Sequence, residues 1–142
     1  LISSWIAGAP EVEAAWTLHK GRFVAACEAP TMSAQEHFDE GARAYEAGDW
    51  DTAARQFNIV SYNFPSSPYG QEANYFLGVS YYFLEEFDFA NEAFSEYLKV
   101  QSNPRYFQSA VEFKFSIAEQ LNAGAKCRLF GTKQLPKWWQ AL

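Results

Sequence analysis

Several features common in catalytic or membrane-spanning proteins are missing from this 142-residue chain. No run reaches the roughly 18 apolar residues of a transmembrane helix. There is no Gly-rich phosphate loop and no serine nucleophile elbow, and neither of the two cysteines is flanked by a plausible base. Nucleic-acid binding is not expected, because the net charge is −6 and no groove-reading motif occurs. The sequence therefore predicts a protein that is not an enzyme and holds no cofactor.

Histidine is also scarce, and His19 and His37 are the only two. His37 stands among Glu36, Asp39 and Glu40, which is a composition from which a metal site could be imagined. The same carboxylates are favoured electrostatically at the start of a helix. We therefore predict that His37 is structural and that no metal is bound.

The two cysteines, Cys27 and Cys127, leave pairing open, because their separation neither demands nor forbids a disulfide. Residues 24–27, Val-Ala-Ala-Cys, look like a lipoprotein cleavage box. Such a box follows an apolar run, whereas charged residues precede this one, so lipidation at Cys27 is not expected. Residues 16–27 are instead predicted to form a small β-hairpin.

What the chain does contain is a repeated register of glycine, alanine and phenylalanine. Two glycines, 37 residues apart, each have an alanine at +12 and a phenylalanine at +16; the two sets are Gly41, Ala53, Phe57 and Gly78, Ala90, Phe94. Glycine inside a helix costs about 1 kcal/mol relative to alanine, so both glycines predict a close approach of a second helix. We expect the small alanine to lie opposite each glycine. This spacing is typical of the tetratricopeptide repeat (TPR).

Turn signals divide the chain at matching places. Asp49 and Asp88 are each expected to cap the second helix of a unit. Prolines at 65, 68 and 104 separate the units. The resulting prediction is an all-α chain with an N-terminal extension over 1–32, two TPR-like hairpins over 33–101, and a third, incomplete or deviant repeat with a basic tail over 104–142. In that third unit Ser116 stands near the glycine place and Arg128 near the alanine place.

Three stretches resemble one family of cell-envelope TPR proteins. They read AGDWDTAARQF, FPSSPYGQEANYFLGVSYY and AVEFKFSIAEQLNAGAKCRLFG. Over about 33–130 the chain resembles the BamD (ComL) family, the lipoproteins of the outer-membrane β-barrel assembly machine; the YbgF/CpoB family of periplasmic TPR proteins is the alternative.

The BamD resemblance implies a right-handed superhelix of helical hairpins in a periplasmic, non-catalytic scaffold that holds partner subunits and receives aromatic-ended strands of unfolded outer-membrane proteins. It also implies a lipid anchor to the outer membrane, placed upstream of Leu1. The YbgF/CpoB resemblance implies an adaptor in envelope maintenance or division. Because Trp138 and Trp139 are not the polar cap that a solenoid end needs, we also expect a fragment or a processed form.

A binding groove is predicted on the concave side, which first helices line in a TPR array. The positions three before, one after and four after each glycine face it. They form an aromatic and apolar strip suited to extended peptides with aromatic side chains: Phe38, Ala42, Tyr45, Tyr75, Val79 and Tyr82. The alternative is that these residues pack against the N-terminal extension or a neighbouring helix.

Charge is segregated along the chain. Residues 33–101 carry a net −9 and residues 102–142 a net +4. Solvated helix faces explain most of this. The basic residues of the tail, Lys126, Arg128, Lys133 and Lys137, could also dock on an acidic partner or an anionic surface.

Overall fold

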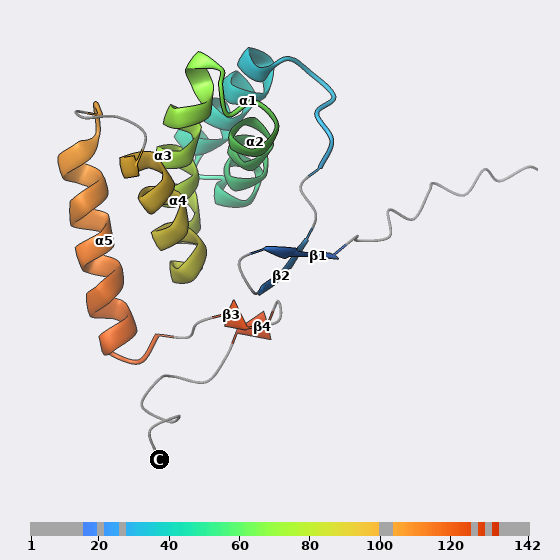
Figure 1. Cartoon of the computed structure of the whole chain (residues 1–142). Helices are drawn as coiled ribbons and strands as arrows, with labels where there is room; N and C mark the ends of the chain where they lie inside the picture. Colours follow the sequence, from blue (N-terminus) through green and yellow to red (C-terminus); the bar gives the residue numbers. More distant parts are fainter. Residues whose placement is uncertain are drawn as a thin grey trace, which may run out of the picture.

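The computed structural model of the chain describes residues 16–19, 22–25, 28–99, 104–125, 128–129 and 132–133. The predicted all-α class is confirmed: five helices lie side by side as antiparallel hairpins, with α5 at one end of the row (Figure 1). The helices are α1 Ala34–Ala47, α2 Trp50–Asn63, α3 Pro68–Phe83, α4 Phe87–Lys99 and α5 Phe107–Asn122. None of them is long and apolar enough to cross a membrane, as far as the described residues go.

One small antiparallel β-hairpin precedes the helices in the chain, and another follows them. Strand β1, Trp16–His19, pairs with β2, Arg22–Ala25, where the sequence predicted a hairpin. Strand β3, Arg128–Leu129, pairs with β4, Thr132–Lys133. Among the described residues after α5, these strands are the regular structure, and no second helix of a third hairpin is found there.

Helix starts follow the local sequence in most cases. Ser33 and Glu36 form a reciprocal capping box at α1, and the Asp49 carboxylate accepts the Thr52 N–H at α2. Ser67 caps α3 ahead of Pro68. The expectation for α4 was wrong, because α4 begins at Phe87 and Asp88 lies inside its first turn rather than at the cap.

The atoms nearest to the register glycines belong to the phenylalanines, whereas the sequence predicted the alanines opposite the glycines. A Cβ on Gly41 would lie 3.0 Å from Cε1 of Phe57, and one on Gly78 would lie 2.8 Å from Cδ1 and Cε1 of Phe94. The ring at +16 therefore covers each glycine. Both alanines of the register, Ala53 and Ala90, are fully buried in the surrounding core clusters.

A third close approach, which the register does not indicate, occurs at Gly70. A Cβ there would lie 2.5 Å from the carbonyl oxygen of Phe64 and 2.7 Å from that of Pro65. The first turn of α3 thus packs directly on the backbone of the segment that follows α2. Glycine is required at this joint, because only a hydrogen fits between the helix and the two carbonyls.

Helix α5 packs on α3 and α4 through Ala110 and Ile117, which are buried in the core cluster of the second hairpin. The backbone N–H of Tyr106, just before α5, donates to the buried Tyr97 hydroxyl of α4 at 2.7 Å. Burial raises the pKa of the Tyr97 phenol. These contacts hold α5 against the second hairpin.

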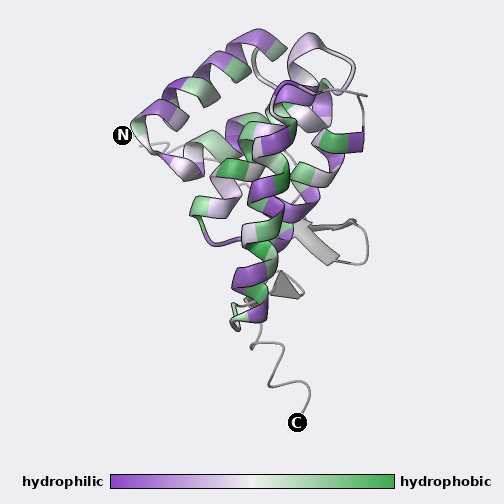
Figure 2. Ribbon diagram, turned by 90° about the vertical axis from the view of Figure 1, so that its left-hand side faces the viewer, coloured by the Kyte–Doolittle hydropathy of each residue, from purple (hydrophilic) through white to green (hydrophobic). Residues whose placement is uncertain are grey.

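The outer side of α5 differs from the matching side of α3. Phe115 stands 37 residues after Gly78, at the place of a third glycine, and is 68% exposed. With Phe107 and Val111 it forms an exposed apolar stripe on α5, the helix that faces the viewer in Figure 2. Gly78 leaves room for the Phe94 ring of α4, whereas Phe115 presents an exposed ring of its own.

Candidate functional site

Two tyrosines of α3 pair with two serines of α5 along the seam between these helices. The Tyr75 and Ser109 hydroxyls share a hydrogen bond of 2.8 Å, and so do those of Tyr82 and Ser116. Seven residues, about two helical turns, separate the pairs on each helix. Each buried or half-buried hydroxyl thus has a partner, as such groups require.

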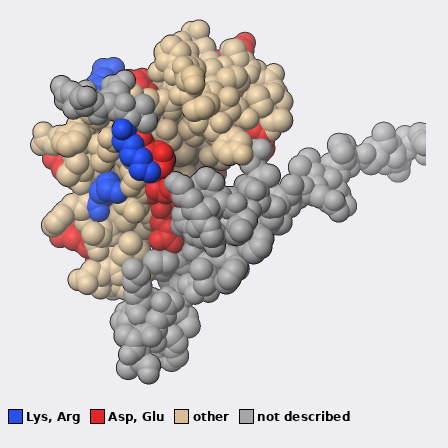
Figure 3. All heavy atoms as spheres, viewed as in Figure 1, with Lys and Arg blue, Asp and Glu red and all other residues tan. Residues whose placement is uncertain are grey.

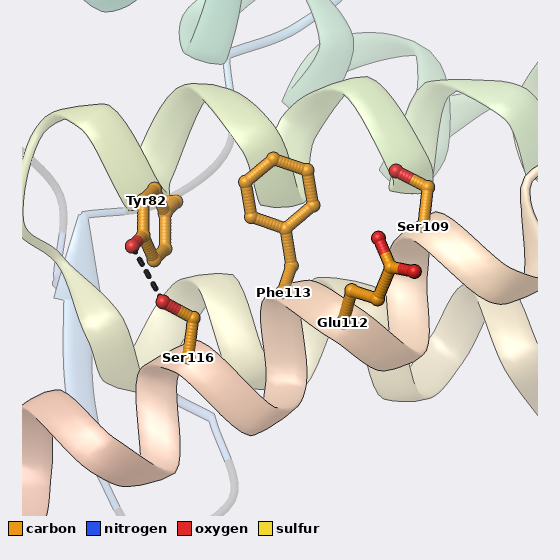
Figure 4. Close-up of a pocket in the computed structure, with 5 residues that line it drawn as sticks. All are labelled: Tyr82, Ser109, Glu112, Phe113 and Ser116. Atoms are coloured by element: carbon orange, nitrogen blue, oxygen red, sulfur yellow. Dashed lines mark hydrogen bonds between the residues drawn. The ribbon is translucent and has the colours of Figure 1, made fainter.

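A hollow of about 320 Å³ lies along this seam. Ser109 and Glu112 lie at one end of it, Tyr82 and Ser116 at the other, and Phe113 between them (Figure 4). The Phe113 ring stacks on Phe94 with centroids 5.2 Å apart and meets Tyr82 edge to face at 5.0 Å. The aromatic wall of the hollow is therefore fixed by the core behind it.

A group of half-buried and exposed aromatic rings adjoins the hollow through Tyr82. We call it the aromatic edge: Tyr45, Trp50, Tyr82 and Phe83. Trp50 stacks on Phe83 with centroids 4.5 Å apart and ring planes 15° apart. Tyr45 meets Trp50 edge to face, and Tyr82 meets Phe83 in the same way. Phe83 is 51% exposed, so this edge offers aromatic surface to a ligand.

The six residues predicted to line the groove do not share one surface. Tyr75 and Val79 are buried, at 7% and 1% exposure, because α5 lies over them. Phe38 packs among the rings of Phe57, Tyr69 and Phe76.

The other three predicted residues are half-buried. Ala42 packs against a core cluster built from buried residues of α2, α3 and α4. Tyr45 belongs to the aromatic edge, and its phenol pKa is raised, first by burial and then by Tyr75 and Tyr106. Tyr82 is the one predicted groove residue that lines the hollow.

Sequence reasoning missed the α5 side of the site, which comprises Ser109, Glu112, Phe113 and Ser116. The groove positions were counted from a glycine in each unit, and the third unit has none. The inward face of α5 could have been predicted from its helical spacing of apolar residues, which are Ala110, Phe113, Ile117 and Leu121. The missed residues lie within that face or at its border.

His37 has a structural role. It is 2% exposed, and its Nε2 accepts the backbone N–H groups of Thr31 and Met32 at 3.2 Å each. Its Nδ1 lies 2.7 Å from Oε1 of Gln56. The imidazole thereby ties the segment before α1 to α2. No group of three or more metal-binding side chains occurs among the described residues.

The charged groups near the hollow point in different directions. Glu112, on its rim, is exposed and accepts a hydrogen bond from the Gln108 amide at 3.0 Å. Lys114 turns away toward α4, where its Nζ donates to Oδ1 of Asn91 at 2.6 Å and to the Ser95 hydroxyl at 2.7 Å. Burial, followed by the nearby Lys99, lowers the pKa of Lys114.

Some predictions fall outside the described residues. These are the cysteine pairing, the lipobox residue Cys27, the tail residues Lys126 and Lys137, and Trp138 and Trp139. Arg128 and Lys133 lie in β3 and β4. Docking of the basic tail on an acidic partner or anionic surface stays a prediction.

The comparisons with known proteins identify a family. The family model described as YfiO, outer membrane lipoprotein, matches residues 30–111, more than half of the chain. This segment contains both hairpins and the first residues of α5. No curated protein and no solved structure matches.

Proposed function

Because the chain belongs to the YfiO family of outer membrane lipoproteins, we propose that it is a non-catalytic scaffold of the bacterial cell envelope. In this proposal it acts in outer-membrane protein assembly as a BamD-like component, anchored by lipid on the periplasmic side of the outer membrane. Its partners are other protein subunits and extended, aromatic-containing polypeptides. The alternative is a YbgF/CpoB-like adaptor role, and the depletion experiment below distinguishes the two roles.

The observation that supports polypeptide binding is the aromatic edge beside the hollow. Exposed aromatic surface on a rigid helical frame is the usual anchor of a protein interface, since such rings bury large areas at low entropic cost. The Trp50–Phe83 stack is held by Tyr45 and Tyr82 from two different helices. A bound segment would therefore meet a preformed surface, which lowers the cost of ordering on binding.

Peptide titration tests this surface. The probe is an acetylated, amidated heptapeptide, Ala-Tyr-Phe-Lys-Phe-Tyr-Ala, added to the ¹⁵N-labelled chain and followed by NMR. Phe83→Ala should weaken binding about five-fold or more, because an aromatic anchor is worth more than 1 kcal/mol. Tyr62→Ala is the matched control, since Tyr62 is 63% exposed on α2 and outside the aromatic edge. Equal weakening by both variants, or by neither, would contradict the proposed surface.

Depletion in the host separates the two cellular roles. Loss of β-barrel proteins from the outer membrane, restored when the parent protein is expressed again, is expected for the assembly role. Normal barrel levels with delayed constriction would instead support the adaptor role.

A further inference from the structure

We propose that the hollow between α3 and α5 receives a lysine or arginine side chain of the bound polypeptide, with Glu112 pairing with its cation. This inference rests on the proposed function, because it requires that a polypeptide lies on this side of the molecule. It adds a charge preference that the family match does not supply, since Glu112, Phe113 and Ser116 lie beyond the matched segment.

The lining of the hollow carries one charge. Tyr82 and Phe113 supply aromatic surface, and Glu112 is the single ionisable carboxylate among the lining residues. Each serine is already hydrogen-bonded to a tyrosine of α3. A ligand side chain in the hollow would thus contact two aromatic rings, two serine hydroxyls that already have hydrogen-bond partners, and one carboxylate (Figure 4).

The described part of the chain does not provide Glu112 with a cation of its own. Its hydrogen bond comes from the neutral amide of Gln108. The nearest lysine along α5, Lys114, is held by Asn91 and Ser95 of α4. The carboxylate therefore stands beside the hollow with acceptor capacity left for a ligand.

A basic side chain matches this arrangement better than other groups. Its methylene stem packs on aromatic rings while its charged head stays at the rim, where a carboxylate and ring quadrupoles both attract it. The volume of about 320 Å³ is at the small end for ligand sites, which suits one side chain rather than a cofactor.

The net charge of the chain around the hollow is negative, like the charge of Glu112. Residues 28–125 carry fifteen Asp and Glu against five Lys and Arg, a net −10. Figure 3 shows acidic side chains over the described face, with the few basic ones on the side of α4 and α5. Such a field attracts cationic segments and repels anionic ones.

The experiment compares three peptides that differ at one position. They are the heptapeptide with central lysine used above and its analogues with glutamine or glutamate in place of that lysine. NMR titrations at about 50 mM and 500 mM salt should give tighter binding of the lysine peptide, by about five-fold over glutamine at low salt. The preference should shrink at high salt because exposed ion pairs are screened. Shifts should include the amides of Phe113 and Ser116.

Variants of Glu112 assign the preference to this carboxylate. E112Q should abolish the lysine preference, and E112K should favour the glutamate peptide instead. E119Q is the control, because Glu119 is exposed on the same helix but does not line the hollow. Since Glu112 is exposed, these variants are expected to fold, which circular dichroism checks directly.

Each outcome has a distinct meaning. A lysine preference that E112Q removes and E119Q keeps supports the inference. Equal binding of all three peptides overturns the inference and leaves the proposed function standing. A preference that survives E112Q places the cation elsewhere and also overturns it. If none of the peptides binds, the proposed polypeptide-binding function fails, and the inference fails with it.

Discussion

Replacing the three close-packed glycines by alanine should destabilise the fold in the order Gly70, Gly78, Gly41. Two effects oppose each other at these sites. Alanine gains up to about 1 kcal/mol of helix propensity over glycine, whereas overpacking a core costs about 1–3 kcal/mol. The outcome at each site depends on what the new methyl group meets and on whether that neighbour can move.

The structure gives a different neighbour at each site. At Gly41 the methyl would lie 3.0–3.1 Å from the Phe57 ring, which is itself stacked on Phe76. The clash is milder than at Gly78, so the two effects nearly cancel. At Gly78 it would lie 2.8–2.9 Å from Phe94, whose ring is stacked on Phe113. We expect a net loss of about 1–2 kcal/mol there.

Gly70→Ala should be the most damaging of the three. Its methyl would lie 2.5 Å from the Phe64 carbonyl oxygen, so the backbone joint between α2 and α3 must move. We expect a loss of about 3 kcal/mol or more.

Thermal melts followed by circular dichroism at 222 nm measure the series. For a chain of this size, 1 kcal/mol corresponds to a Tm shift of about 2–4 °C. Gly48→Ala is the control for backbone strain alone, because Gly48 has φ +74° and nothing within 4 Å of the added methyl.

A second-site change identifies the contact. Phe94→Leu should partly relieve Gly78→Ala, with a coupling energy of at least about 0.5 kcal/mol. If Gly78→Ala melted at or above the parent temperature, or showed no coupling to Phe94, the close approach of that ring would be refuted.

Three further predictions concern other parts of the fold. Tyr97→Phe should lower the free energy of unfolding by about 1–3 kcal/mol, because the Tyr106 N–H loses its acceptor; Tyr62→Phe, at an exposed tyrosine, should not change it in urea titrations. Hydrogen bonds from the Ser33 side chain and backbone hold the pKa of Glu36 below its ordinary value of 4.5, so its stabilisation is present above that pH and is lost on acidification. Glu36→Gln should therefore melt below the parent at pH 7, with the difference shrinking as the pH falls below 4.5; a constant difference would exclude the carboxylate as its source. Phe115→Ser should change stability by less than about 0.5 kcal/mol while reducing binding of a hydrophobic dye, because the ring is exposed; a large loss of stability would show that the ring is covered in solution.

The sequence by itself determined the helical hairpins. Helix boundaries are local: Ser33, Asp49 and the Ser67–Pro68 pair satisfy or replace backbone N–H groups at helix starts. The glycine register correctly indicated where two helices approach closely. It did not reveal that the rings of Phe57 and Phe94 are the nearest side chains to the glycines, because this depends on how α2 packs on α1 and α4 on α3.

Only the tertiary structure decided which predicted groove residues reach solvent. Tyr75 and Phe38 hold equivalent places in their units, yet α5 covers Tyr75 while Phe38 lies in an aromatic cluster of the first hairpin and α3. Helical periodicity tells which residues share a face, but whether that face is covered depends on a helix more than twenty residues further along the chain. For the same reason the hollow could not be counted from a repeat, since it exists only where Tyr82 meets the α5 residues Glu112, Phe113 and Ser116.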